Sequence, residues 1–124
     1  MTALKVLIVE DSRATREMLA AAVQTLGPVE VHTVVSGFEA LKMLPRHRFA
    51  LIITDLNMPD INGLELINFV KKNPHYRDTP LVVVTTEGRD QDRARGLQLG
   101  ANEYIVKPFV PQQIVELVKR YLGL

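Results

Sequence analysis

Polar side chains directly follow several apolar runs, at the positions where buried strands would end. The run FALIIT leads into Asp55, and the run KVLIV leads into Glu10 and Asp11. Two later runs end in Thr85 and Lys107. Because the carboxyl ends of parallel strands meet at one edge of a sheet, these groups are expected to lie together. The pattern predicts a functional site at that edge.

The chemistry open to these groups is narrow. Clustered carboxylates repel one another unless a cation joins them. Three acids with no histidine or cysteine nearby form a hard oxygen site that suits a divalent ion such as Mg²⁺. A lysine and a hydroxyl could hold the remaining oxygens of a phosphoryl group, and a carboxylate can itself accept that group as an aspartyl phosphate.

Each residue also has a purely structural explanation. Acids near a helix N-terminus, such as Glu10 and Asp11, gain about 0.3–1 kcal/mol from the helix dipole. Thr85 is a β-branched residue suited to a strand, and the position of Lys107 before Pro108 favours extended backbone. Asp55 could cap a turn. Separate explanations do not account for four polar strand ends at one edge, so a joint site is preferred.

The elements that would position these residues alternate along the chain. Apolar β-branched runs predict strands at 5–9, 29–35, 49–54, 81–85 and 103–106. Between and after them, apolar periodicity and capping residues predict helices after Ser12, from Ser36 to Pro45, over 63–73, over 89–100 and from Pro111. Five strands alternating with five helices predict an α/β fold, a doubly wound parallel sheet with helices on both faces.

The helix expected over 89–100 is the weakest. Gly96 lies in its interior, which costs about 1 kcal/mol relative to alanine, and its apolar anchors are few: Ala94, Leu97 and Leu99. We expect it to be the element that rearranges most easily. A poorly packed surface helix without a switching role explains the pattern equally well.

The length, composition and net charge of the chain exclude several classes of protein. The 124 residues are enough for one domain, with 47% apolar residues, no cysteine and a net charge of +1. This charge predicts neither a nucleic-acid nor a membrane partner, and no apolar run approaches the roughly 20 residues of a membrane span. We expect a cytoplasmic protein. His32, His47 and His75 are scattered in the sequence, so metal binding by histidine is not expected.

The whole chain resembles the receiver domain of two-component response regulators, most closely the stand-alone chemotaxis type. The resemblance is carried by Glu10-Asp11 and by the segments DLNMPDING at 55–63, VVVTTE at 82–87 and GANEYIVKPF at 100–109. It implies a flavodoxin-like (βα)5 fold with strand order 2-1-3-4-5. We expect a single receiver domain over 1–124 with no effector domain, the alternative being a receiver excised from a longer regulator.

The resemblance also implies roles for individual residues. Asp55 would accept a phosphoryl group from a sensor histidine kinase. Glu10, Asp11, Asp55 and the backbone carbonyl of Asn57 would hold Mg²⁺, with no organic cofactor. Lys107 would pair with the phosphoryl group, and the Lys107–Pro108 peptide bond would be cis.

A conformational switch is implied as well. Thr85 would move toward the phosphoryl oxygen while Tyr104 turns inward behind it. This would reorganise the face formed by the helix over 89–100, the strand over 103–106 and the last helix, where a downstream protein would dock. Glu87, two residues after the threonine, is typical of the chemotaxis type. The protein would be a monomer or a phosphorylation-dependent dimer.

One residue departs from the family pattern. The position after the switch threonine is commonly alanine or glycine, and here it is Thr86. A bulkier side chain at the mouth of the site could hinder attacking water or the phosphodonor, which predicts slower phosphoryl turnover.

Two other functions compete with the switch. A phosphatase of the haloacid-dehalogenase type also uses an aspartyl phosphate near Mg²⁺. Such an enzyme has a second acid two residues after the nucleophile, where this chain has Asn57, and it also needs a substrate pocket. A receiver acting as a constitutive scaffold is disfavoured because the acceptor-site residues are all present. The preferred function is a protein-interaction switch that catalyses only its own phosphorylation and dephosphorylation. The resemblance to the stand-alone type favours chemotaxis or motility as the process.

Overall fold

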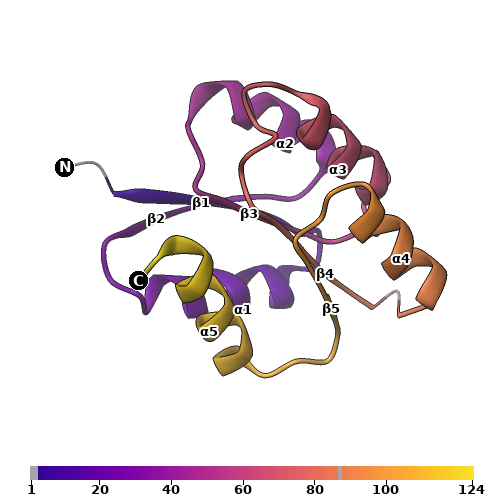
Figure 1. Cartoon of the computed structure of the whole chain (residues 1–124). Helices are drawn as coiled ribbons and strands as arrows, with labels where there is room; N and C mark the ends of the chain where they lie inside the picture. Colours follow the sequence, from indigo (N-terminus) through magenta and orange to yellow (C-terminus); the bar gives the residue numbers. More distant parts are fainter. Residues whose placement is uncertain (1–2, 87) are drawn as a thin grey trace.

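Five parallel strands form a sheet between two layers of helices (Figure 1). The computed structural model describes residues 3–86 and 88–124. In chain order the elements are β1 (Leu4–Val9), α1 (Arg13–Gln24), β2 (Val29–Val34), α2 (Gly37–Met43), the short 3₁₀ helix η1 (Leu44–Arg46), β3 (Leu51–Thr54), α3 (Gly63–Lys72), β4 (Leu81–Thr85), α4 (Asp90–Gln98), β5 (Glu103–Val106) and α5 (Pro111–Leu122). The strand order is β2-β1-β3-β4-β5, which confirms the flavodoxin-like prediction.

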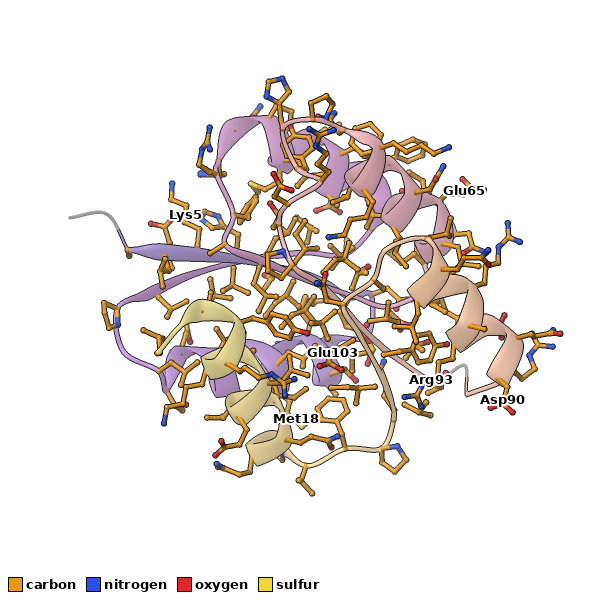
Figure 2. All side chains as sticks on the ribbon, viewed as in Figure 1. Lys5, Met18, Glu65, Asp90, Arg93 and Glu103 are labelled. Carbon is orange, nitrogen blue, oxygen red and sulfur yellow. The ribbon has the colours of Figure 1, made fainter. Side chains whose placement is uncertain are left out.

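The core lies on both faces of the sheet. Helices α1 and α5 cover one face, and α2 and α3 cover the other, with α4 beside them at the β5 edge (Figure 1). Every residue of β3 and β4 is buried, which explains their unbroken apolar sequences. Side chains fill the space between the layers (Figure 2). Each fully buried Val, Leu or Ile contributes about 1.5–3 kcal/mol of transfer free energy.

The helix starts follow the capping residues in the sequence. The Ser12 hydroxyl accepts a hydrogen bond from the Thr15 amide at 3.5 Å, and the Ser36 hydroxyl accepts one from the Glu39 amide at 3.2 Å. Pro111 is the first residue of α5. The two serine hydroxyls pair with amides that have no partner within the helix, so they fix where α1 and α2 begin. None of the helices in the described ranges is long and apolar enough to span a bilayer.

Helix α4 is packed differently from the prediction. Of its three expected anchors, Ala94 and Leu97 are exposed and Leu99 is half-buried. The buried residue is Gly96, where an added Cβ would lie 3.5 Å from the Tyr104 ring. This is an ordinary contact distance, so the position has room for a methyl group, and α4 buries very little apolar side chain against the domain.

Candidate functional site

Hydrogen bonds that continue the sheet bring the polar strand ends together. The Asp55 amide donates to the Val9 carbonyl at 3.1 Å, and the Lys107 amide donates to the Thr85 carbonyl at 2.7 Å. The Glu10 amide donates to the carbonyl of Val34 at 3.0 Å. Glu10, Asp55 and Lys107 each lie one position beyond their strand, held in register with the neighbouring strand.

Three carboxylates and one ammonium group meet at this edge. Carboxylate oxygens of Glu10, Asp11 and Asp55 all lie within 4.8 Å of one another. Glu10 and Asp55 are buried, whereas Asp11 is exposed. The Lys107 ammonium lies 2.8 Å from Glu10 Oε1 and 3.2 Å from Asp55 Oδ2. The structure therefore brings together the acids and the lysine that the sequence singled out.

Glu10 is the carboxyl group of this site that is hardest to ionise. Burial raises its pKa to about 7, the negative charge of Asp55 acts in the same direction, and the hydrogen bond from Lys107 opposes both. Its second oxygen, Oε2, is buried and has no hydrogen-bond partner among the described residues. A buried oxygen without a partner beside two other carboxylates fits a site for a divalent cation.

Asp55 is held in its ionised form. Burial opposes ionisation, but a hydrogen bond from the Thr85 side chain, one from the Asn57 amide at 3.1 Å and the Lys107 charge outweigh it and keep the Asp55 pKa below its ordinary value. Burial also favours the neutral amine of Lys107, yet its hydrogen bond to Glu10 and the Asp55 charge raise the lysine pKa. At neutral pH the site therefore contains a carboxylate oxygen facing an ammonium group.

Close backbone contact requires a glycine at position 63, the first residue of α3 after the loop that begins at Asp55. The Gly63 amide donates to the Leu56 carbonyl at 2.9 Å. A Cβ on Gly63 would lie 2.5 Å from both the Asp55 carbonyl oxygen and the Leu56 Cα. Only glycine lets the start of α3 lie this close to the residue that carries the central carboxylate.

Two residues that the sequence did not indicate, Asp60 and Arg16, hold the backbone around the site. The carboxylate of Asp60 accepts hydrogen bonds from the amides of Gly37 at 3.0 Å, Phe38 at 2.8 Å and Ile61 at 2.8 Å. Loss of hydration opposes its ionisation, but these amides hold the Asp60 pKa below its usual range. Asp60 thereby ties the loop after β3 to the start of α2. Its place in the sequence, near other turn residues, gave no sign of this partner.

Arg16 is the second such residue. Its guanidinium, on α1, donates to the carbonyl oxygens of Glu10 at 3.0 Å and Asp11 at 3.3 Å. It therefore fixes the backbone of both acids from the adjacent helix. An arginine five or six residues after an acid is an ordinary helix-surface residue, so the sequence carries no signal for this contact.

Thr85, Thr86 and the Lys107–Pro108 bond follow β4 and β5 at the same edge of the sheet. Thr85 is fully buried and Thr86 beside it is exposed. Tyr104 is only 6% exposed, so its ring is already turned into the protein. The Lys107–Pro108 bond is cis, as expected. Glu87 lies outside the described residues.

Two of the three histidines lie side by side in the structure, although they are distant in the sequence. The rings of His32, on β2, and His47, after η1, have centroids 4.3 Å apart. Glu30 lies beside them, and ligand atoms of all three fall within 4.8 Å of one another. The separation along the chain hid this contact, because it depends on how β2 and the segment before β3 align against β1.

The chain is similar in sequence and in fold to known proteins. Residues 6–119 match the model of the response regulator receiver domain. A chemotaxis protein CheY homolog of Campylobacter jejuni is 39% identical over 97% of this chain and 93% of its own length. Chemotaxis protein CheY1 of Helicobacter pylori is 36% identical over 97% of this chain and 98% of its own. The structure of the chemotaxis response regulator CheY4 of Vibrio cholerae superimposes with a TM-score of 0.88 at 36% identity, covering 97% of this chain and 99% of that one.

Proposed function

Because this chain belongs to the response regulator receiver domain family, whose members act in two-component signalling, we propose that Asp55 accepts a phosphoryl group and that this event switches a protein-binding face. The observation that carries the proposal is the Asp55 carboxylate. It is buried and ionised, one oxygen lies 3.2 Å from the Lys107 ammonium, and two further acids lie within 4.8 Å. Such a group can act as a nucleophile toward phosphorus.

The acids would hold Mg²⁺. Glu10, Asp11, Asp55 and the backbone carbonyl of Asn57 are the proposed ligands, with Glu10 acting through water. The bound ion would supply positive charge to the oxygens of the phosphoryl group. This assignment rests on the hard oxygen donors and on the unpartnered buried oxygen of Glu10.

The chain's own residues would then position the reaction. An Asp55 oxygen would form the bond to phosphorus while the nitrogen–phosphorus bond of a phosphohistidine breaks, and the electron pair leaves with the imidazole. The Asn57 amide orients the carboxylate through its bond to Oδ1. Lys107, already paired with Asp55, would neutralise a phosphoryl oxygen, and the Thr85 hydroxyl would donate to another. Positioning and charge neutralisation provide most of the catalysis in such transfers.

The output would be a change in protein binding rather than turnover of an external substrate. The proposed docking face consists of α4, β5 and α5, with Tyr104 on β5 joining it to the site. A histidine kinase would be the phosphodonor, and a downstream protein would bind the switched face. The names of the relatives favour chemotaxis as the process. A single receiver domain over 1–124, a cytoplasmic location and a monomer or phosphorylation-dependent dimer remain predictions.

The test is intact-mass spectrometry after incubation with acetyl phosphate, with and without Mg²⁺. We expect one phosphoryl adduct that depends on Mg²⁺ and is absent from Asp55→Asn. The matched control is Asp78→Asn, which removes an exposed carboxylate away from the site and is expected to be phosphorylated like the parent chain. An adduct of equal yield in Asp55→Asn would overturn the proposal, and no adduct under any condition would favour the constitutive scaffold.

A further inference from the structure

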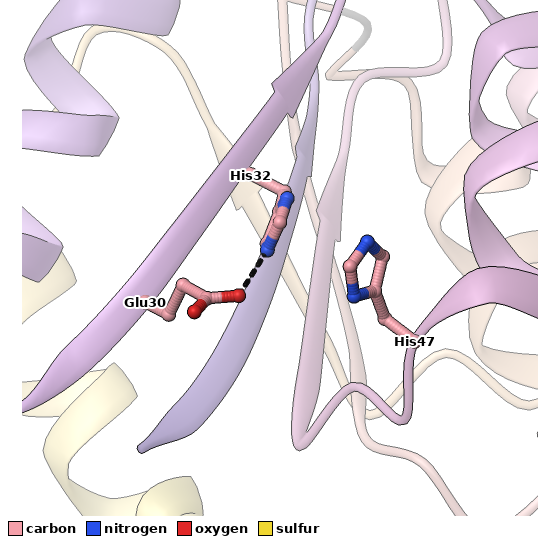
Figure 3. A group of neighbouring side chains, drawn as sticks. All are labelled: Glu30, His32 and His47. Carbon is pink, nitrogen blue, oxygen red and sulfur yellow. Dashed lines mark hydrogen bonds and ion pairs between the residues drawn. The ribbon is translucent and has the colours of Figure 1, made fainter. Parts of the chain in front are cut away.

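A second group of ligand-type side chains lies on the edge strand β2, separate from the phosphoryl site. Glu30 and His32 are two residues apart on this strand, so they point to the same face of the sheet. His47 reaches them from the segment between η1 and β3 (Figure 3). Two imidazoles and a carboxylate from two distant parts of the chain therefore face one another.

The cluster lies toward the other end of the sheet from Asp55. Glu30 pairs with Lys5 near the beginning of the β1–β2 ladder, whereas Val9 and Val34 at its end lie beside the phosphoryl site. Figure 2 shows Lys5 on the α2–α3 side of the sheet and far from α4. A ligand at this cluster would not touch the residues of the proposed phosphorylation reaction.

The donor set suits a late first-row transition metal. We propose that Glu30, His32 and His47 form a binding site for a divalent ion of the Zn²⁺ class. Imidazole nitrogen is a preferred ligand of Zn²⁺, and two His with one Glu is a known three-ligand set that leaves a position for water. The proposal is independent of the function proposed above.

The distances are close to those that coordination needs. Ligand atoms around a tetrahedral Zn²⁺ lie about 3.4 Å apart, given metal–ligand bonds of about 2.0–2.1 Å. In the structure the three ligand atoms lie within 4.8 Å of one another, and His32 Nε2 already contacts Glu30 Oε2 directly. The most distant of these atoms would have to approach by at most about 1.4 Å, and the His32 and Glu30 ligand atoms would have to separate slightly. Rotation about χ angles can supply both movements.

The positions of the rings are set by packing. The Phe49 ring, which is 7% exposed, lies 5.6 Å from the His32 ring and 5.6 Å from the His47 ring. His32 keeps only about a fifth of its side chain exposed. Two rings held in place before binding reduce the entropy cost of forming the site.

Lys5 already places a positive charge at this cluster. Its ammonium lies 3.2 Å from His47 Nδ1 and 3.8 Å from Glu30 Oε2. Lys5 and His47 also line a hollow of about 520 Å³ on one side of the cluster. The lysine would have to move aside when the metal binds, so it is predicted to weaken metal binding. This competition makes Lys5 a sensitive test of the site.

The metal would join the edge strand β2 to the segment before β3. Because the unfolded chain does not hold the three ligands together, binding to the folded state would raise the melting temperature.

The experiment is a Zn²⁺ titration of the full chain, prepared without a polyhistidine tag and with excess Mg²⁺ to occupy the acidic site. Calorimetry measures affinity, and NMR of the imidazole nitrogens locates the ion. We expect one Zn²⁺ per chain, with shifts of the His32 and His47 nitrogens and not of His75. Both His32→Asn and His47→Asn should weaken Zn²⁺ binding by at least about tenfold. Loss of an outer-shell partner already costs about tenfold or more in metal affinity, and these variants remove a direct ligand.

Two further variants control this experiment. His75→Asn removes an exposed histidine outside the cluster and should bind Zn²⁺ like the parent chain. Lys5→Met keeps the length of the side chain without its charge and should bind more tightly. Unchanged affinity in both cluster variants, weaker binding in Lys5→Met, or shifts centred on His75 would overturn the proposal and leave a hydrogen-bonded cluster that only braces β2.

Discussion

At the scale of single residues, the acidic site combines two carboxylates with opposite tendencies. Lys107 pairs with both Glu10 and Asp55, yet the Asp55 pKa is lowered while burial raises that of Glu10 to about 7. The difference follows from their other partners, because Asp55 also receives hydrogen bonds from Thr85 and the Asn57 amide. Asp55 is therefore the acid of the two that stays ionised more readily, as a nucleophile must.

The raised Glu10 pKa predicts a pH-dependent cost of folding without metal. Between its ordinary pKa of 4.5 and about 7, the folded state holds a proton that the unfolded state has lost. Stability from this residue therefore falls as pH rises through that range and stays low above it. We expect Glu10→Gln, a neutral side chain of the same shape, to be more stable than the parent chain at pH 8, and this advantage to shrink at pH 5. Urea unfolding in the presence of a chelator measures both.

The control for this prediction is Glu116→Gln, which changes an exposed glutamate on α5. Its stability relative to the parent should differ little between the two pH values. An equal effect of pH on Glu10→Gln and on the parent chain would show that Glu10 does not carry the cost.

Thr86 predicts a kinetic effect at the mouth of the site. Its exposed side chain follows the buried Thr85, where the family commonly has a smaller residue. We expect Thr86→Ala to speed both gain and loss of the phosphoryl group, because water and the phosphodonor approach more freely. The decay of the adduct, followed by mass spectrometry, measures this. Equal rates in the two proteins would refute the steric explanation, and Thr86→Ser separates the methyl group from the hydroxyl.

At the scale of elements, two glycines at helices predict opposite effects of alanine. At Gly63 the new Cβ would meet backbone atoms at 2.5 Å, so Gly63→Ala should destabilise the fold by roughly 1–3 kcal/mol, the usual cost of overpacking. At Gly96 the nearest atoms, in the Tyr104 ring, lie at an ordinary contact distance of 3.5 Å. Gly96→Ala should therefore stabilise the chain by up to about 1 kcal/mol through helix propensity. Urea midpoints compare the two, and a loss of stability in both variants would contradict the account of Gly96.

Helix α4 is predicted to be the least protected helix. It buries a glycine rather than an apolar side chain, and Arg89 at its N-cap position cannot accept a capping hydrogen bond because a guanidinium only donates. We expect amides within 89–100 to exchange faster than those of the core strands, consistent with an element that has two arrangements of similar energy. Hydrogen exchange as slow as in β3 and β4 would count against a switching role.

The elements themselves were largely predictable from the sequence, because apolar runs and capping residues are local signals. β5 has the predicted bounds, and β1 starts one residue before the predicted start. β2 ends one residue earlier than expected, at Val34. β3 begins at Leu51 rather than Phe49, whose ring packs against the histidines. Contacts between distant segments were not predictable. Asp60 with the start of α2, Arg16 with the backbone of the acids, and His32 with His47 all depend on register and side-chain direction, which single-sequence patterns do not specify.

At the scale of the whole molecule, the sheet presents different chemistry at its two ends. The carboxyl ends of the strands gather acids and Lys107, as expected where strand order reverses in a doubly wound fold. Toward the other end, the edge strand β2 carries the histidine cluster. The two clusters share no residue, so a change at one end can be measured without altering the residues at the other.

The central claim is that the phosphoryl group is carried by Asp55. It is tested most directly by phosphorylating the chain in Mg²⁺, reducing it with borohydride and mapping the peptides by mass spectrometry, since reduction converts an aspartyl phosphate to homoserine. We predict homoserine at position 55 alone, and none without Mg²⁺. Homoserine at Asp11 or elsewhere with position 55 unchanged, or no labelled residue at all, would contradict the account.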